Sequence, residues 1–90
     1  METTTRYFLT YSGRQLPLQL TEELQANALR NRNTWFEAEY DLQGRIRSVV
    51  KMVYGEVEMR HDYEYDAAGR LCGATILLGD EEPQRLEIQP

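Results

Sequence analysis

Three turn signals divide the second half of the chain at regular intervals. Asp41–Gly44 and Asp66–Gly69 each begin with an Asp that can start a type I turn and end with a Gly that can take the left-handed conformation. Between them, Tyr54–Gly55 suits a two-residue hairpin turn. The intervening segments alternate apolar and polar residues, the period of a β-strand. Residues 33–88 are therefore predicted to form an antiparallel meander of about five strands.

The N-terminal quarter of the chain alternates in the same way. Residues 5–20 are predicted to form a hairpin. A two-residue turn at Gly13–Arg14 would place Tyr11 opposite Leu16, and a turn at Ser12–Gly13 would keep the same side chains on one face. Pro17 has no N–H to donate, so its strand is expected at a sheet edge or with a bulge.

Residues 21–32 contain the one predicted helix, with Thr21 as its N-cap. At about three turns it would form only when packed against the sheet. We therefore expect a mainly β (α+β) single domain over residues 1–90. It would consist of an antiparallel meander sheet of about five strands, an N-terminal hairpin and one short helix, either packed on the sheet or closing a partial barrel.

The turns also predict a cross-strand register, which gives the sheet one charged and one apolar face. The charged pairs are Asp41 with Arg45, Glu39 with Arg47, Lys51 with Glu58, Arg47 with Asp62 and Arg45 with Glu64. The apolar pairs are Tyr40 with Ile46, Phe36 with Val50, Met52 with Val57, Tyr65 with Leu71 and Met59 with Leu77. A last strand is predicted over Arg85–Ile88, and it would place Leu86 opposite Leu77. Each pair is worth only about 0.2–1 kcal/mol, so together they specify register more than stability.

Composition excludes several classes of function. The 90 residues carry a net charge of −5, which disfavours binding to nucleic acid. A single cysteine cannot form an internal disulfide or a Cys-based zinc site and fits a reducing compartment. The first five residues have neither a basic nor an apolar signal region, and the apolar runs are far too short to span a membrane. We expect a cytoplasmic protein with no membrane or nucleic-acid partner.

One strand breaks the two-face pattern. Cys72, Ala74, Ile76 and Leu78 place an apolar stripe on the otherwise charged face, where Trp35 is predicted to lie opposite Lys51. Such a stripe requires a cover, which could be the helix, the hairpin or another chain. The candidate interface residues are Trp35, Lys51, Ile76 and Leu78. They predict a protein partner, with a homodimer as one form of it.

The only histidine defines a second candidate site. The parity of His61 places it on the apolar face, and the candidate ligand-binding residues around it are His61, Tyr40, Tyr63, Tyr65, Ser48 and Thr75. They could form a polar pocket in which His61 titrates. Alternatively, His61 is a buried residue that hydrogen-bonds to Ser48 or Thr75. Asp62 and Glu64 project to the other face, so we expect no metal site, and no motif implies a cofactor or catalytic residues.

A repeated motif carries a family resemblance. The pattern Tyr-Asp-x-x-Gly-Arg occurs at residues 40–45 and 65–70, and Tyr63 extends the second copy. It resembles the YD repeat of Rhs-type proteins, whose β-hairpins wind into a large shell, and it implies that the chain is a relative of a shell fragment. The alternative is hairpin chemistry alone, in which Asp starts the turn and Arg pairs with it. The rest of the chain resembles small bacterial domains of unknown function.

Together these patterns favour a non-enzymatic protein-interaction or binding module in the bacterial cytoplasm. The alternatives are a small-ligand or weakly enzymatic pocket around His61 and a relative of a Rhs-type shell.

Overall fold

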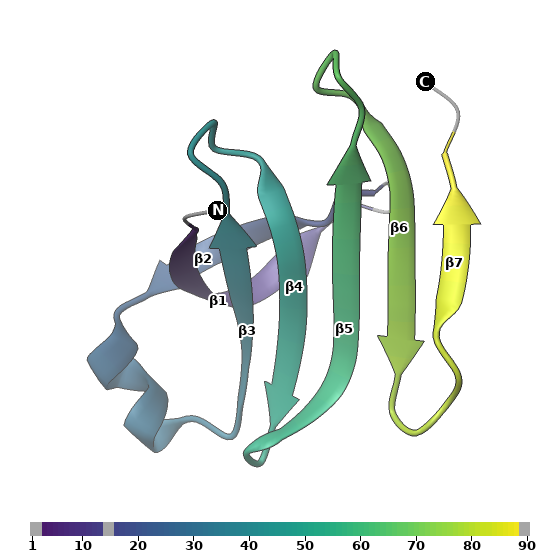
Figure 1. Cartoon of the computed structure of the whole chain (residues 1–90). Coiled ribbons are helices and arrows are strands. Elements are labelled where there is room, and N and C mark those ends of the chain that lie inside the picture. The colour runs from purple at the N-terminus through teal and green to yellow at the C-terminus, as the bar shows by residue number, and fades with distance from the viewer. Residues whose placement is uncertain (1–2, 14–15, 89–90) are drawn as a thin grey trace.

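The fold is a single antiparallel sheet. The computed structural model describes residues 3–13 and 16–88, and within them the chain forms seven strands and one short helix (Figure 1). In chain order the elements are β1 (Thr4–Ser12), β2 (Gln19–Leu24), the 3-10 helix η1 (Ala26–Asn31), β3 (Thr34–Tyr40), β4 (Ile46–Val53), β5 (Glu56–Tyr65), β6 (Leu71–Leu78) and β7 (Gln84–Glu87). Their order in the sheet is β2-β1-β3-β4-β5-β6-β7, and the sheet does not close into a barrel. None of the described helical residues belongs to a helix long and apolar enough to cross a membrane.

The mainly β class, the five-strand meander and the N-terminal hairpin are confirmed, with β3–β7 as the meander and β1–β2 as the hairpin. The predicted turns are also present. Tyr54 and Gly55 both have positive φ, 50° and 79°, as a two-residue turn of this hand requires. In the turn that follows β3, Asp41 Oδ1 accepts hydrogen bonds from the backbone N–H groups of Gln43 (3.0 Å) and Arg45 (2.9 Å).

The two copies of the repeated motif have the same construction. Asp66 Oδ1 accepts the backbone N–H groups of Ala68 and Arg70, both at 2.9 Å, just as Asp41 does in the first copy. Arg45 and Arg70 then form ion pairs with the aspartates of their own turns, at 2.9 and 3.4 Å. The predicted hairpin chemistry of Asp, Gly and Arg is therefore confirmed, and the relation to YD repeats stays a prediction.

The register of the N-terminal hairpin was predicted wrongly. Tyr11 lies opposite Leu20 rather than Leu16, because the connection between the two strands is longer than two residues. Arg14, half of the predicted turn, lies outside the described residues. Pro17 is in the loop before β2, and β2 is an edge strand of the sheet. The loop folds over the sheet, where Leu18 is buried in the core.

The predicted helix over residues 21–32 is only partly present. Thr21 to Leu24 continue β2, and Thr21 lies opposite Thr10 of β1 instead of capping a helix. What remains is η1, which has no buried residue and no side-chain cap. A segment with so narrow an apolar stripe gains little from helix formation, and pairing with β1 satisfies its backbone groups instead. The helix therefore covers neither face of the sheet as a packed layer.

The three hairpins that join β3, β4, β5 and β6 each contain a bulge soon after the turn, in the second strand. The register shifts between Glu39 and Tyr40, between Lys51 and Met52, and between Glu64 and Tyr65. The extra residues on the opposing strands are Arg47, Glu58 and Cys72. Because side chains alternate with a period of two, one extra residue exchanges the two faces of the strand beyond it.

These bulges explain which predicted pairs are correct. The pairs next to the turns are confirmed: Tyr40 with Ile46, Met52 with Val57, and Tyr65 with Leu71. Beyond the bulges the predictions are off by one residue, so that Phe36 lies opposite Lys51, Lys51 opposite Met59, and Met59 opposite Leu78. The ion pairs of Asp41 with Arg45 and of Lys51 with Glu58 do form. The other three predicted charged pairs are not among the ion pairs of the described residues.

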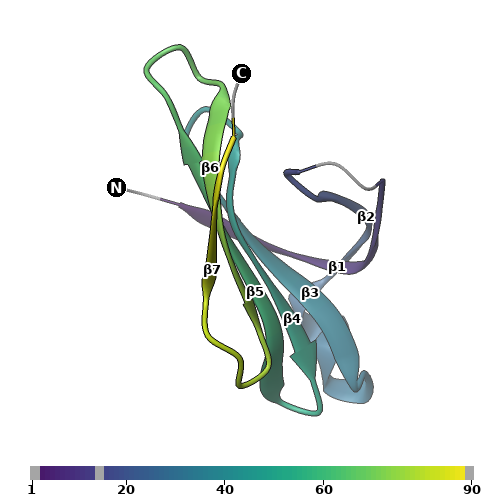
Figure 2. The same ribbon diagram turned by 90° about the vertical axis from the view of Figure 1, so that its right-hand side faces the viewer.

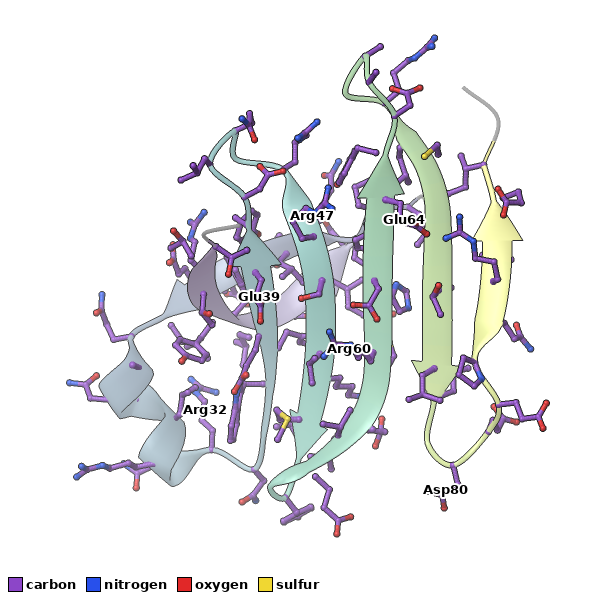
Figure 3. The ribbon with its side chains drawn as sticks, in the orientation of Figure 1. Arg32, Glu39, Arg47, Arg60, Glu64 and Asp80 are labelled. Carbon is purple, nitrogen blue, oxygen red and sulfur yellow. The ribbon has the colours of Figure 1, made fainter. Side chains whose placement is uncertain are left out.

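The bulges give the sheet an inner face, which turns toward the β1–β2 hairpin, and an outer face. Figure 2 shows the hairpin standing away from β3–β7 on the inner side. The buried apolar core on the inner face consists of Phe8, Leu18, Phe36, Ala38, Ile46, Val49, Tyr63 and Ala74. The outer face carries the charges, and Figure 3 shows Glu39, Arg60 and Glu64 projecting from it.

Arg85 of the last strand, β7, crosses the outer face of the neighbouring strand β6. β7 pairs Leu86 with Ala74, so the predicted pairing with Leu77 is wrong. Arg85 of β7 reaches over Gly73 of β6 and forms an ion pair with Glu64 of β5. A Cβ atom at position 73 would overlap the Arg85 guanidinium, so this crossing requires glycine there.

Replacing Gly73 tests this contact. Gly73→Ala in an Arg85→Ala background should raise the free energy of unfolding by about 0.4–1 kcal/mol, because alanine restricts the unfolded chain. With Arg85 present, we expect that gain to be cancelled or reversed, since the guanidinium must move. Urea denaturation of the two single variants and the double variant measures the coupling. Strictly additive effects of the two substitutions would show that Arg85 does not lie over Gly73.

Candidate functional site

The histidine lies within a closed hydrogen-bond chain. His61 and Tyr63 follow one another on the inner face of β5, and His61 Nδ1 is 2.7 Å from Tyr63 Oη. The same hydroxyl accepts the backbone N–H of Leu18 at 3.2 Å. His61 is 6 % exposed and Tyr63 2 %. These hydrogen bonds therefore connect Leu18, just before β2, to β5 in the middle of the meander. Little of the His61 or Tyr63 side chain is open to solvent.

Burial, rather than the hydrogen bonds, decides the charge of this pair. Tyr63 Oη accepts the Leu18 N–H and keeps one proton and one lone pair, so it can bond to His61 Nδ1 in either imidazole tautomer. Burial lowers the pKa of His61, although the charge of Asp62 opposes the shift. Burial also raises the pKa of Tyr63 to about 12. Both groups are held neutral at neutral pH.

The predicted ligand-binding residues are divided between the two faces. Tyr40, Tyr65 and Tyr63 share the inner face with His61, but Ser48 and Thr75 flank Asp62 on the outer face. The residues directly opposite His61 are Val49 and Ile76. The prediction that Ser48 or Thr75 partners the imidazole was therefore wrong, because the bulges at Glu58 and Cys72 shift each pairing by one residue.

The other two candidate tyrosines, Tyr65 and Tyr40, make contacts elsewhere in the core. Tyr65 Oη donates to the carbonyl oxygen of Ile46 at 2.6 Å, and the Arg45 guanidinium lies 5.1 Å from its ring centre. Tyr40 carries the Arg6 guanidinium 5.2 Å from its ring centre. Burial raises the pKa of both phenols. These contacts order the core. Within the described residues no group of three or more His, Cys, Asp or Glu side chains could hold a metal ion.

The predicted interface residues are likewise separated. Trp35 is on the outer face, where its Nε1 donates to Glu37 Oε1 at 3.0 Å. Lys51, Ile76 and Leu78 are on the inner face. The apolar stripe of β6 therefore belongs to the core side, and the expected second apolar face does not exist along it. The homodimer prediction loses that argument and stays a prediction.

One cross-strand row forms the floor of an open groove on the inner face. Phe36, Lys51, Met59 and Leu78 lie directly opposite one another along β3, β4, β5 and β6. Tyr11 of β1 stands beside this row, with its ring 5.5 Å from that of Phe36 in an edge-to-face arrangement. The turn after β6 completes the wall. This inner groove has a volume of about 420 Å³ and is lined by Tyr11, Phe36, Lys51, Glu58, Met59, Leu78, Gly79, Asp80 and Glu81.

The inner groove is lined by one basic residue, Lys51 of the floor row, and three acidic residues, Glu58, Asp80 and Glu81. Lys51 Nζ forms an ion pair with Glu58 at 2.9 Å, so these two charges largely neutralise one another. Asp80 and Glu81 are exposed and have no ion-pair partner among the described residues. The groove is therefore net acidic, and its unmatched charges lie at the β6–β7 turn. Figure 3 places Asp80 at the tip of the β6–β7 turn.

Sequence reasoning placed Lys51 and Leu78 in one candidate interface, but on the charged face instead of the inner face. It missed Tyr11, Phe36 and Met59 as lining residues, because the unbulged register put Lys51 on the opposite face from Phe36. The available signal was the change of apolar parity between Leu71 and Ala74, which a bulge explains and a regular strand does not.

Comparison with protein families places the chain. It belongs to a family of unknown function (DUF6156), whose model matches residues 1–90. Searches of curated proteins and of solved structures give no match.

Removing the hydroxyl of Tyr63 should loosen the loop before β2. Tyr63→Phe leaves the Leu18 N–H and His61 Nδ1 without their partner, which should lower the free energy of unfolding by about 1–3 kcal/mol. Tyr54→Phe, at an exposed turn position, should change it by less than about 0.5 kcal/mol. Urea denaturation measures both, and hydrogen exchange at the Leu18 amide should quicken only in Tyr63→Phe. Equal stabilities for the two variants would contradict the hydrogen-bond chain.

The lowered pKa of His61 predicts a pH dependence of stability. The unfolded state takes up a proton near the ordinary histidine value of 6.5, before the folded state does. Stability is therefore fully present above that value and is lost as the pH falls below it toward the folded pKa. Denaturation of wild type and His61→Gln across this range should show a loss that the variant lacks. An NMR titration giving His61 a pKa above 6.5 would contradict the prediction without requiring any variant.

Proposed function

We propose that this member of the DUF6156 family is a non-enzymatic binding module whose binding surface is the inner groove. The observation that carries the proposal is an open cavity of about 420 Å³ whose lining is largely apolar, beside the buried core of the described residues. Its volume is within the range of about 300–1,000 Å³ typical of ligand sites. A floor of aromatic and aliphatic side chains in which the one charge, Lys51, is paired with Glu58 has the composition of a recognition surface.

The observations favour the groove over a pocket around His61. The polar atoms that His61 and Tyr63 turn toward each other are already hydrogen-bonded, and both side chains are buried. A ligand there would have to displace Leu18 from the core. In the groove, by contrast, Leu78 is 48 % exposed and Tyr11 45 %, so apolar surface is available without rearrangement.

We place this activity in the cytoplasm, with a protein as the partner. The single cysteine, Cys72, suits a reducing compartment and the acidic charge disfavours nucleic acid. Kinship with Rhs-type shells is a weaker proposal, since it is supported by the two hairpin turns alone.

Binding of a neutral apolar probe tests the proposal. Titrating indole into ¹⁵N-labelled protein should give saturable NMR shifts at Tyr11, Phe36, Met59 and Leu78, with affinity in the millimolar range. Leu78→Ser should weaken binding about tenfold, because it removes about 1.5 kcal/mol or more of apolar contact.

Leu42→Ser is the matched control. Leu42 is 74 % exposed in the β3–β4 turn, at the opposite end of the sheet from the β6–β7 turn (Figure 1), so its loss should leave indole affinity unchanged. The absence of saturable shifts would refute the groove as a binding site. Shifts centred on His61 and Tyr63 would favour the alternative pocket instead.

A further inference from the structure

A second hollow adjoins the inner groove. This side hollow has a volume of about 340 Å³ and is lined by Val53, Tyr54, Glu56, Val57, Glu58, Gly79 and Asp80. It shares Glu58, Gly79 and Asp80 with the inner groove. The N–H of Gly79 donates to the carbonyl oxygen of Glu58 at 2.8 Å, which fixes the β6–β7 turn as a ridge between the two.

The arrangement of the two hollows selects an extended ligand. Tyr54 and Val57 are both exposed in the side hollow, as Tyr11 and Leu78 are in the inner groove. A molecule as small as indole fills part of one hollow and contacts one set of apolar side chains. A peptide can place one apolar side chain in each and pass over the ridge with its backbone.

The charge of the ridge selects the residue between those two side chains. Asp80 lines both hollows, and Glu81 stands beside it on the inner-groove side. Neither has an ion-pair partner within the part of the chain that the structure describes, whereas the Lys51 charge is already matched by Glu58. A basic side chain crossing the ridge would therefore meet two unmatched carboxylates, and an acidic one would be repelled.

We propose that the two hollows together bind a segment of a partner protein in which a Lys or Arg lies between two apolar residues. This inference rests on the proposed function, since it names the partner of the same groove. The apolar residues supply affinity, and Asp80 and Glu81 supply the preference for a basic residue. The net charge of −5 favours approach of such a segment at low salt.

Three blocked pentapeptides test the inference. They share the order Trp, Gly, central residue, Gly, Leu, and differ only in a central Lys, Gln or Glu. NMR titration should show the Lys peptide binding about tenfold more tightly than the Glu peptide, with the Gln peptide between them, as expected for two exposed charge pairs. The preference should shrink as salt is raised.

Two double variants, each lacking two negative charges, test whether the peptide preference depends on the charges of the ridge or on the net charge of the protein. Asp80→Asn with Glu81→Gln should remove the preference for the Lys peptide. Glu37→Gln with Glu39→Gln removes the same number of charges from the outer face, keeps an acceptor for Trp35 Nε1, and should leave the preference intact. Tyr54→Asn should weaken all three peptides but not indole, because only the peptides reach the side hollow; Asn also tolerates the positive φ at this position.

The outcomes distinguish the two levels of the proposal. Equal affinity for the three peptides, loss of preference in the outer-face variant, or no peptide binding while indole still binds would overturn the basic-segment inference and leave the proposed function standing. If neither indole nor any peptide shifted the groove resonances, the proposed function itself would fail. The expected ranking, lost only in the Asp80 and Glu81 variant, would support both.

Discussion

A β-bulge near the start of β4, β5 and β6 determines how the sheet distributes its side chains. At Arg47, Glu58 and Cys72 one residue is inserted, and the strand beyond it exchanges its two faces. Without these insertions Val49 and Ala74 would lie among the outer charges; with them both are completely buried. A sheet with one cover, the β1–β2 hairpin, can bury only one apolar face, and the bulges gather the apolar residues there.

The same insertions shape the two regions with functional interest. On the inner face they align Val49, His61 and Ile76 in one row, so that the imidazole is closed in and its polar partner is Tyr63 on the same strand. In the neighbouring row they bring Lys51 between Phe36 and Met59. His61 is thus buried, whereas Met59 lies in the open groove that we propose as the recognition surface.

The sequence predicted the class of fold, the meander and its turns, because Asp, Gly and Arg act locally at Asp41–Arg45 and Asp66–Arg70. It did not predict the bulges, which depend on burial across several strands rather than on any local residue preference. The helix expected from Thr21 failed for a related reason, since pairing with β1 outweighed a weak local propensity. Among the candidate residues, the tyrosines near His61 and Trp35 were assigned to the correct faces. Ser48, Thr75, Lys51, Ile76 and Leu78 were assigned to the wrong face.

The cross-strand register is the most direct test of the account. In NOE spectra of the labelled protein, the bulged sheet predicts contacts that pair Val49 with His61 and Tyr63 with Ala74. A regular sheet built on the same turns would instead pair Val50 with Met59 and Tyr63 with Gly73. Observation of the first set would establish the single apolar face and the groove row. Observation of the second would return the β6 stripe to the outer face and remove the basis for the inner groove.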